Sequence, residues 1–119
     1  ELNPQTGLPL SERQVFISFE SNIIPDGAIV DSQGNVWIAL WGASKVAVYR
    51  PDGSLLTELH VSASQVSCPA FGGANCSELR VTTAWANLDD TSKSSQPDAG
   101  CVFKFASAHV GQIEAMYKL

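Results

Sequence analysis

Short apolar runs alternate with turn signals along this chain, and this pattern limits the fold more than any other feature. Residues 24–53 hold three strand-like runs and three turns. Most turns in this stretch contain Pro-Asp-Gly or Gly-Asn, which are residue types that reverse a chain between neighbouring strands. Between them, residues 36–41 are almost continuously apolar, as expected of a strand that is buried on both faces. The sequence therefore predicts an all-β chain built from antiparallel meanders.

The predicted strands form two groups of four, preceded by a single run over 13–19. First strands of the two groups lie roughly forty residues apart, and four strands at that period are typical of β-propeller blades. A polar loop is expected over 86–99, and no amphipathic helix of useful length is predicted. The strands of the first group are 28–31, 36–41, 45–50 and 55–61, and those of the second are 66–71, 78–84, 101–105 and 113–117.

These groups predict how the chain is divided. Residues 1–20 are expected to end a preceding blade, residues 21–62 to form one blade and residues 63–119 to form another. A propeller ring needs at least about four blades. Three arrangements are therefore open: further blades outside these residues, a ring made from copies of the chain, or an irregular packing of the two blades.

Composition excludes several classes of function. Apolar residues make up 45% of the chain and charged residues 16%, which is typical of a folded domain. The net charge is −5 with only seven Lys and Arg. Neither a nucleic acid nor an anionic membrane surface is therefore expected as a partner. No apolar run approaches the roughly 18 residues that cross a bilayer.

The three cysteines, Cys68, Cys76 and Cys101, predict reduced thiols. Their number is odd and their spacing is not that of a zinc site or a disulfide framework. No secretory signal is visible in the sequence. A reducing compartment, and so a cytoplasmic location, is expected.

Five motifs carry a resemblance to a known family. They are IPDG at 24–27, GNVWIA at 34–39, SC and FGG within 67–73, LRVTTA at 79–84 and QPDAG at 96–100. In this order and at these distances they resemble the C-terminal part of the SMP-30/gluconolactonase/regucalcin family. The resemblance implies a six-bladed propeller that binds one divalent metal ion in its central channel and hydrolyses sugar lactones such as gluconolactone.

The resemblance also assigns a role to Asp26. In the family an Asp in a Pro-Asp-Gly motif, a Glu and an Asn hold the metal, which is calcium, zinc, magnesium or manganese. Only the Asp has a counterpart here, at Asp26, where it would also serve as the general base. The Glu and Asn would lie before residue 1, so the lactonase implied is incomplete within these residues.

The residue pattern by itself leaves Asp26 open. Pro-Asp-Gly recurs at 51–53, where Asp52 is expected to be an ordinary turn residue, and Asp26 could be another. However, Asp26 lies where an innermost strand begins, and a carboxylate facing a channel needs a partner or a cation. Two alternatives to a lactonase remain: a calcium-binding regulator of the regucalcin type, and a non-catalytic propeller fragment that assembles with itself or with another chain.

Other candidate residues carry weaker signals. His60 and His109 lack a carboxylate nearby in the sequence, and no serine-hydrolase elbow is present. Residues 31–35 are expected to form a hairpin rather than a calcium loop. Cys68 is expected to be a packed thiol on an inner strand. Packing roles are also expected for the three tryptophans, Trp37, Trp41 and Trp85.

Overall fold

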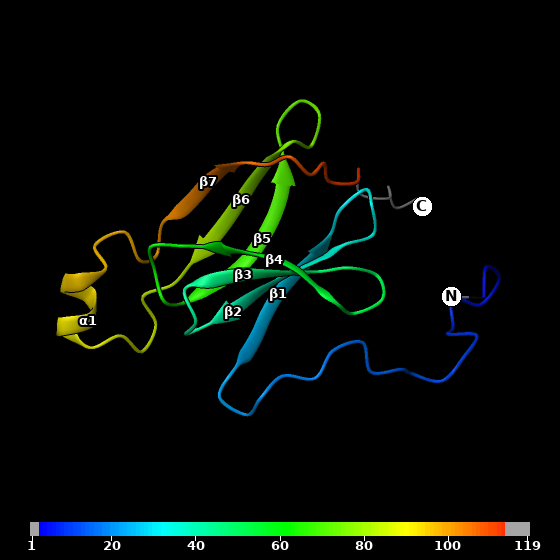
Figure 1. Ribbon diagram of the computed structural model, residues 1–119, viewed down its shortest axis with the longest axis horizontal. Coiled ribbons are helices and arrows are strands. Elements are labelled where there is room, and N and C mark those ends of the chain that lie inside the picture. The colour runs from blue at the N-terminus through cyan, green and yellow to red at the C-terminus, as the bar shows by residue number, and fades with distance from the viewer. Residues whose placement is uncertain (1–2, 114–119) are drawn as a thin grey trace.

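A computed structural model describes residues 3–113, which form two antiparallel sheets packed face to face (Figure 1). The first sheet has the strand order β1-β2-β3-β4, and the second has the order β5-β6-β7. The predicted all-β class and its meander topology are confirmed. The elements are β1 (Ile24–Val30), β2 (Val36–Trp41), β3 (Lys45–Tyr49), β4 (Leu55–His60), β5 (Val66–Gly72), β6 (Glu78–Thr83), α1 (Asp90–Ser95) and β7 (Val102–Ala106).

The innermost strand of the first sheet begins earlier than the sequence indicates. We expected it over 28–31, but β1 begins at Ile24 and pairs there with Trp41 of β2. The prediction was wrong because Pro25 and Gly27 are residue types that usually interrupt a strand. The β1–β2 register shifts between Pro25 and Ala28, and this β-bulge accommodates both residues. Asp26 therefore lies inside a strand.

Three other expectations have different outcomes. Residues 13–19 form no strand in the structure, because among residues 3–113 no neighbouring strand pairs with them. The polar loop predicted over 86–99 contains α1, whose N-cap Asp89 accepts the backbone N–H of Ser92 at 2.7 Å. This helix buries no residue, so it has no apolar periodicity to reveal it. The strand predicted over 113–117 lies, apart from Ile113, outside the described residues.

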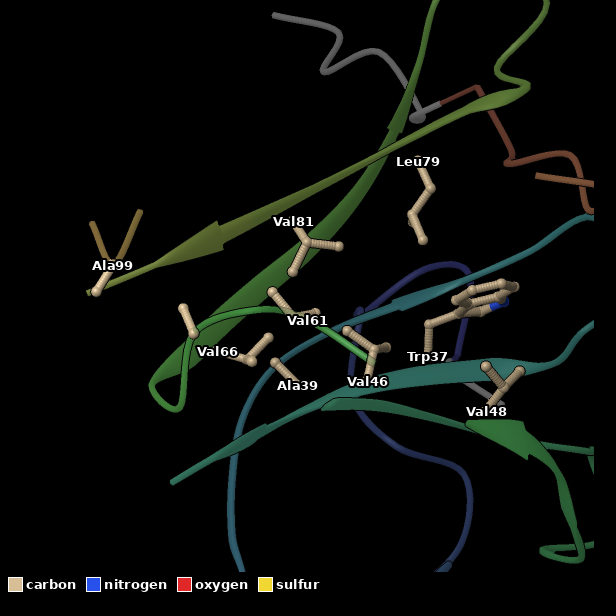
Figure 2. Packing of buried hydrophobic residues seen from close by; sticks show 10 residues of the cluster. Trp37, Ala39, Val46, Val48, Val61, Val66, Leu79, Val81 and Ala99 are labelled. Carbon is tan, nitrogen blue, oxygen red and sulfur yellow. The ribbon is translucent and has the colours of Figure 1, made fainter. Parts of the chain in front are cut away.

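The main hydrophobic core lies between the two sheets (Figure 2). Strands β2 and β3 supply one side of it and β6 supplies part of the other. Each Val or Leu buried in this way contributes roughly 1.5–3 kcal/mol of transfer free energy. The core therefore fixes how the two sheets lie against each other. Its buried members are Trp37, Ala39, Val46, Val48, Val61, Ala63, Val66, Leu79, Val81 and Ala99.

A second cluster covers the opposite face of the first sheet. Ile38, Leu40 and Ala47 are buried there, and partly buried Ile17 and Phe19 pack against them. Side chains alternate between the two faces along β3, with Val46 and Val48 in the main core and Ala47 in the second cluster. Segment 13–23 thus covers an apolar sheet face although it forms no strand.

Candidate functional site

Asp26 lies on β1, an edge strand of the first sheet and the strand expected to be innermost in its blade, and its side chain is exposed. Together with Gly27 it occupies the bulge, where neither residue has a partner in the β1–β2 register. No ion pair among residues 3–113 includes Asp26. The carboxylate is thus solvated and uncommitted within the part of the chain that the structure describes, which leaves it able to bind a cation or accept a proton.

The second sheet meets β1 beside Asp26. The Cα of Gly27 packs so closely against β5 that a Cβ added there would lie 2.6 Å from Cys68 Sγ. The two innermost strands, β1 and β5, therefore lie side by side next to the candidate carboxylate (Figure 1). Cys68 was expected to be a packed thiol, but the residue is exposed even though its side chain lies against Gly27 of β1.

The described residues do not form a complete metal site. Within residues 3–113, no group of three or more His, Cys, Asp and Glu side chains lies close enough together to hold a metal ion. Hard divalent cations prefer several oxygen ligands, and Asp26 can supply one of these. The donor chemistry at Asp26 therefore fits such a cation only if further ligands come from residues beyond those described.

Asp52, the other Pro-Asp-Gly aspartate, is a turn residue as predicted. Its Oδ1 accepts the backbone N–H of Ser54 at 2.9 Å. The hydrogen bond from Ser54 lowers the pKa of Asp52 below its ordinary value. Because the carboxylate is committed to its own turn, Asp52 has no part in the candidate site.

A third aspartate, Asp31, forms the centre of a buried polar network. Its carboxylate is fully buried and accepts the backbone N–H groups of Gln33 and Asn35, each at 2.9 Å. Side-chain donors reach it as well: Nδ2 of Asn35 at 2.9 Å and Nε1 of Trp37 at 3.1 Å. The expectation of a hairpin over 31–35 is confirmed, with Asp31 closing the turn.

His109, in the segment that follows β7, completes this network. Its Nδ1 lies 2.9 Å from Asp31 Oδ2, and its ring packs edge-on against Trp37. No carboxylate lies near His109 in the sequence, and its carboxylate partner in the structure lies 78 residues away in the chain. Neighbouring side chains in the sequence offered no signal of this contact. The network links the β1–β2 turn to the segment after β7, and so joins the two sheets.

The electrostatics of Asp31 depend on opposing contributions. Burial raises its pKa, because desolvation disfavours the charged form. Hydrogen bonds from Asn35, Trp37 and the turn backbone favour the charged form and outweigh burial, so the pKa lies below its ordinary value. Asp31 is therefore held as a carboxylate.

Asp26 lies near the start of β1, and Asp31 directly follows its last residue. Five residues of extended chain place Asp26 and Asp31 on the order of 15 Å apart. A cavity of about 150 Å³ lies at the Asp31 end, lined by residues that include Trp37, Glu58 and His109. His109 and this cavity thus belong to a region separate from Asp26.

The tryptophans have three different environments. Trp37 is 5% exposed and packs in the main core, as expected. Trp41 is half-buried where β2 ends and forms a bridge to Gln65, just before β5. Trp85 is 52% exposed, so it lies outside the core, and its ring lies next to Gly100. In the part of the chain that the structure describes, no helix is long and apolar enough to cross a membrane.

The sequence matches the family described as SMP-30/Gluconolactonase/LRE-like region over residues 2–85. The L-arabinolactonase of Azospirillum brasilense is 39% identical over 93 residues, covering 78% of this chain and 30% of its own length. The regucalcin of Danio rerio is 33% identical over 101 residues, covering 84% of this chain and 34% of its own length.

A solved structure extends the comparison to the fold. The calcium-binding protein regucalcin from Agrobacterium tumefaciens superposes with a TM-score of 0.92 and 36% sequence identity. The match covers 99% of this chain and 40% of that protein. The two sheets therefore have the blade architecture of the regucalcin propeller. The chain spans between 30 and 41% of the length of the curated relatives named here and of a further relative from Rhizobium meliloti. With the family motifs running in order along its two blades, the chain belongs to the SMP-30/gluconolactonase/LRE-like family.

Proposed function

We propose that this chain contributes Asp26 to the active site of a divalent-metal-dependent lactonase that hydrolyses aldonolactones such as gluconolactone. The observation that carries the proposal is an exposed carboxylate on the innermost strand of a family blade, with no ion pair among residues 3–113. The relative named L-arabinolactonase supports the substrate class.

A metal ion, whether calcium, zinc, magnesium or manganese, would supply Lewis-acid polarisation of the lactone carbonyl. Asp26 would be one of its oxygen ligands, with the others supplied from outside the described residues. The exposure of Asp26 fits this role, because its carboxylate is accessible to a cation.

Asp26 would act as the general base of the hydrolysis. It would take a proton from the attacking water while the water oxygen bonds to the lactone carbonyl carbon. The ester bond of the ring then breaks, and Asp26 returns the proton to the departing ring oxygen. The product is the open-chain hydroxy acid, and the carboxylate is regenerated.

The proposal includes a division of the chain. Residues 1–20 would close a preceding blade, residues 21–62 would form one blade and residues 63–119 would form the next. Packing of Ile17 and Phe19 on the outer face of the first sheet supports this assignment. Further blades, or other copies of the chain, would complete the ring. Three free cysteines are consistent with a cytoplasmic location.

A second candidate function is calcium binding without turnover. The relatives named regucalcin favour it, one of them described as a calcium-binding protein. Both candidates use the same carboxylate. They differ in whether a water molecule is activated beside it.

One experiment separates the two candidates. The complete gene product is stripped with EDTA, repleted with Ca²⁺, Zn²⁺, Mg²⁺ or Mn²⁺ singly, and assayed for gluconolactone hydrolysis by acid release. A lactonase loses turnover on stripping and regains it with at least one cation. Turnover that persists in EDTA contradicts the metal mechanism. Calcium binding by titration calorimetry with no lactone opened supports the regucalcin-type alternative.

A further inference from the structure

Two β-bulges face each other on the innermost strands. The register of β1 with β2 shifts between Pro25 and Ala28, and that of β5 with β6 shifts between Val66 and Cys68. Asp26 therefore lies in one bulge and Ser67 in the other. A bulge redirects the side chain it carries and loosens the ladder around it, so a residue in a bulge needs another contact to fix its position.

The two bulges supply that contact to each other. A Cβ at Gly27 would lie 2.6 Å from Cys68 Sγ, 2.7 Å from Cys68 Cβ and 2.7 Å from the Ser67 carbonyl oxygen. Gly27 does not have a positive φ. Glycine is therefore required at 27 by lack of space rather than by backbone conformation. The backbone beside Asp26 therefore packs directly against β5.

The receiving strand is held in turn by β6. The hydroxyl groups of Ser67 and Thr82 are hydrogen-bonded at 2.8 Å, and Thr82 Oγ1 donates to the carbonyl oxygen of Cys68 at 3.3 Å. The Thr82 hydroxyl thus fixes the positions of Ser67 and Cys68, the two residues against which Gly27 packs.

We propose that Gly27, Cys68 and Thr82 are positioning residues for Asp26. The Thr82 hydroxyl holds the β5 bulge in place through its hydrogen bonds. Gly27 packs against two parts of that bulge, Cys68 and the Ser67 carbonyl oxygen. The direction in which Asp26 presents its carboxylate is set by this chain of contacts. The inference rests on the proposed function of Asp26 as metal ligand and general base.

The first test is Gly27→Ala in the complete gene product. An added methyl group must push β1 away from β5, and a displacement of about 1 Å at a reacting group lowers kcat on the order of 100-fold. We expect kcat on gluconolactone to fall by that amount, KM to change much less, and Mn²⁺ affinity measured by electron paramagnetic resonance to weaken. Gly72→Ala is the matched control, because it makes the same change on β5 with nothing within 4 Å of the new methyl group.

A second pair of variants keeps the inference testable if Gly27→Ala does not fold. Thr82→Val removes the hydroxyl at nearly constant volume, whereas Thr82→Ser retains it. We expect Thr82→Val to lower kcat and Mn²⁺ affinity on the order of tenfold, as loss of a supporting hydrogen bond beside a metal ligand does. Thr82→Ser should recover most of that loss.

The outcomes separate this inference from the proposed function. If a folded Gly27→Ala protein keeps the kcat and Mn²⁺ affinity of Gly72→Ala, the positioning inference is overturned. Equal values for Thr82→Val and Thr82→Ser overturn it as well. Asp26→Asn is measured beside them. If that substitution leaves turnover and Mn²⁺ binding intact, the proposed function fails. If it abolishes both while the positioning variants stay normal, only the positioning inference fails.

Discussion

The chain contains the tripeptide Pro-Asp-Gly twice, and both the aspartate and the glycine have different surroundings in the two copies. In the first copy, Asp26 lies inside a strand, exposed and without a register partner. In the second, Asp52 lies in the turn between β3 and β4 and accepts the N–H of Ser54. The tripeptide is the same in both copies, so the residues and elements around it decide whether the carboxylate is bound within a turn or left available.

The two glycines show the same contrast. Gly53 has φ +84°, a left-handed conformation that side chains disfavour. Gly27 has no such conformation and is needed because β5 leaves no room for a side chain. One glycine serves backbone geometry and the other serves a contact between sheets. This difference can be tested by changing the matching residues of both copies.

The largest expected effect is on catalysis. Asp26→Ala should lower lactone turnover on the order of 10³-fold, as loss of a general base does, whereas Asp52→Ala should change it by less than about twofold. Initial rates of acid release from gluconolactone measure both variants. Equal losses in the two variants would contradict the distinction drawn between the copies.

The next largest effect is expected on stability, at Asp31, whose carboxylate is fully buried. Asp31→Ala removes the acceptor of the buried network and leaves the N–H groups of Asn35 and Trp37 without a partner. We expect a loss of about 3 kcal/mol in the free energy of unfolding. Urea denaturation measures it, with Asp52→Ala as the control. A loss below about 1 kcal/mol would show that the network is not structurally important.

The glycine pair is expected to give smaller changes in stability. Gly53→Ala forces a side chain into the left-handed region at a cost of about 1–2 kcal/mol. Gly27→Ala introduces overpacking at a cost of about 1–3 kcal/mol, and unlike Gly53→Ala it should also lower turnover. Urea denaturation and initial rates are measured on the same preparations. If Gly53→Ala lowered turnover as strongly, the two glycines would not have separate roles.

The smallest expected effect concerns acid stability. The hydrogen bond from Ser54 lowers the pKa of Asp52 in the folded protein. The stabilisation is therefore complete above the ordinary carboxyl pKa of about 4 and is lost as pH falls through the lower folded-state value. Asp52→Asn should slightly flatten the fall in thermal stability between about pH 4 and pH 2. A steeper fall in thermal stability in Asp52→Asn than in the unsubstituted protein would contradict a stabilising role of the ionised Asp52 carboxylate.

Much of the fold could be predicted from local pattern. The apolar run of β2, the strand β3 and the turn at 51–53 appear in the structure as expected. Each of these depends on residues within a few positions of one another. The helix α1 could not be predicted in the same way, because it has no buried face and its main signal is one capping aspartate.

The candidate site was less accessible from sequence. Asp26 was identified by resemblance, since its own tripeptide also occurs in an ordinary turn. Two further features had no local signal. The contact of His109 with Asp31 joins the segment after β7 to the first sheet. The close packing of Gly27 against Cys68 joins two strands that are far apart in the chain.

The sequence by itself determined that this chain folds into short antiparallel strands with turns at set places, because side-chain alternation and turn chemistry act over a few residues. Only the tertiary structure decided that Asp26 stays exposed in a bulge, that Asp31 is buried with a histidine, and that Gly27 must lack a side chain. These outcomes depend on packing between β1, β5 and the segment after β7. Contacts of that kind arise when sheets assemble, and a local pattern does not contain them.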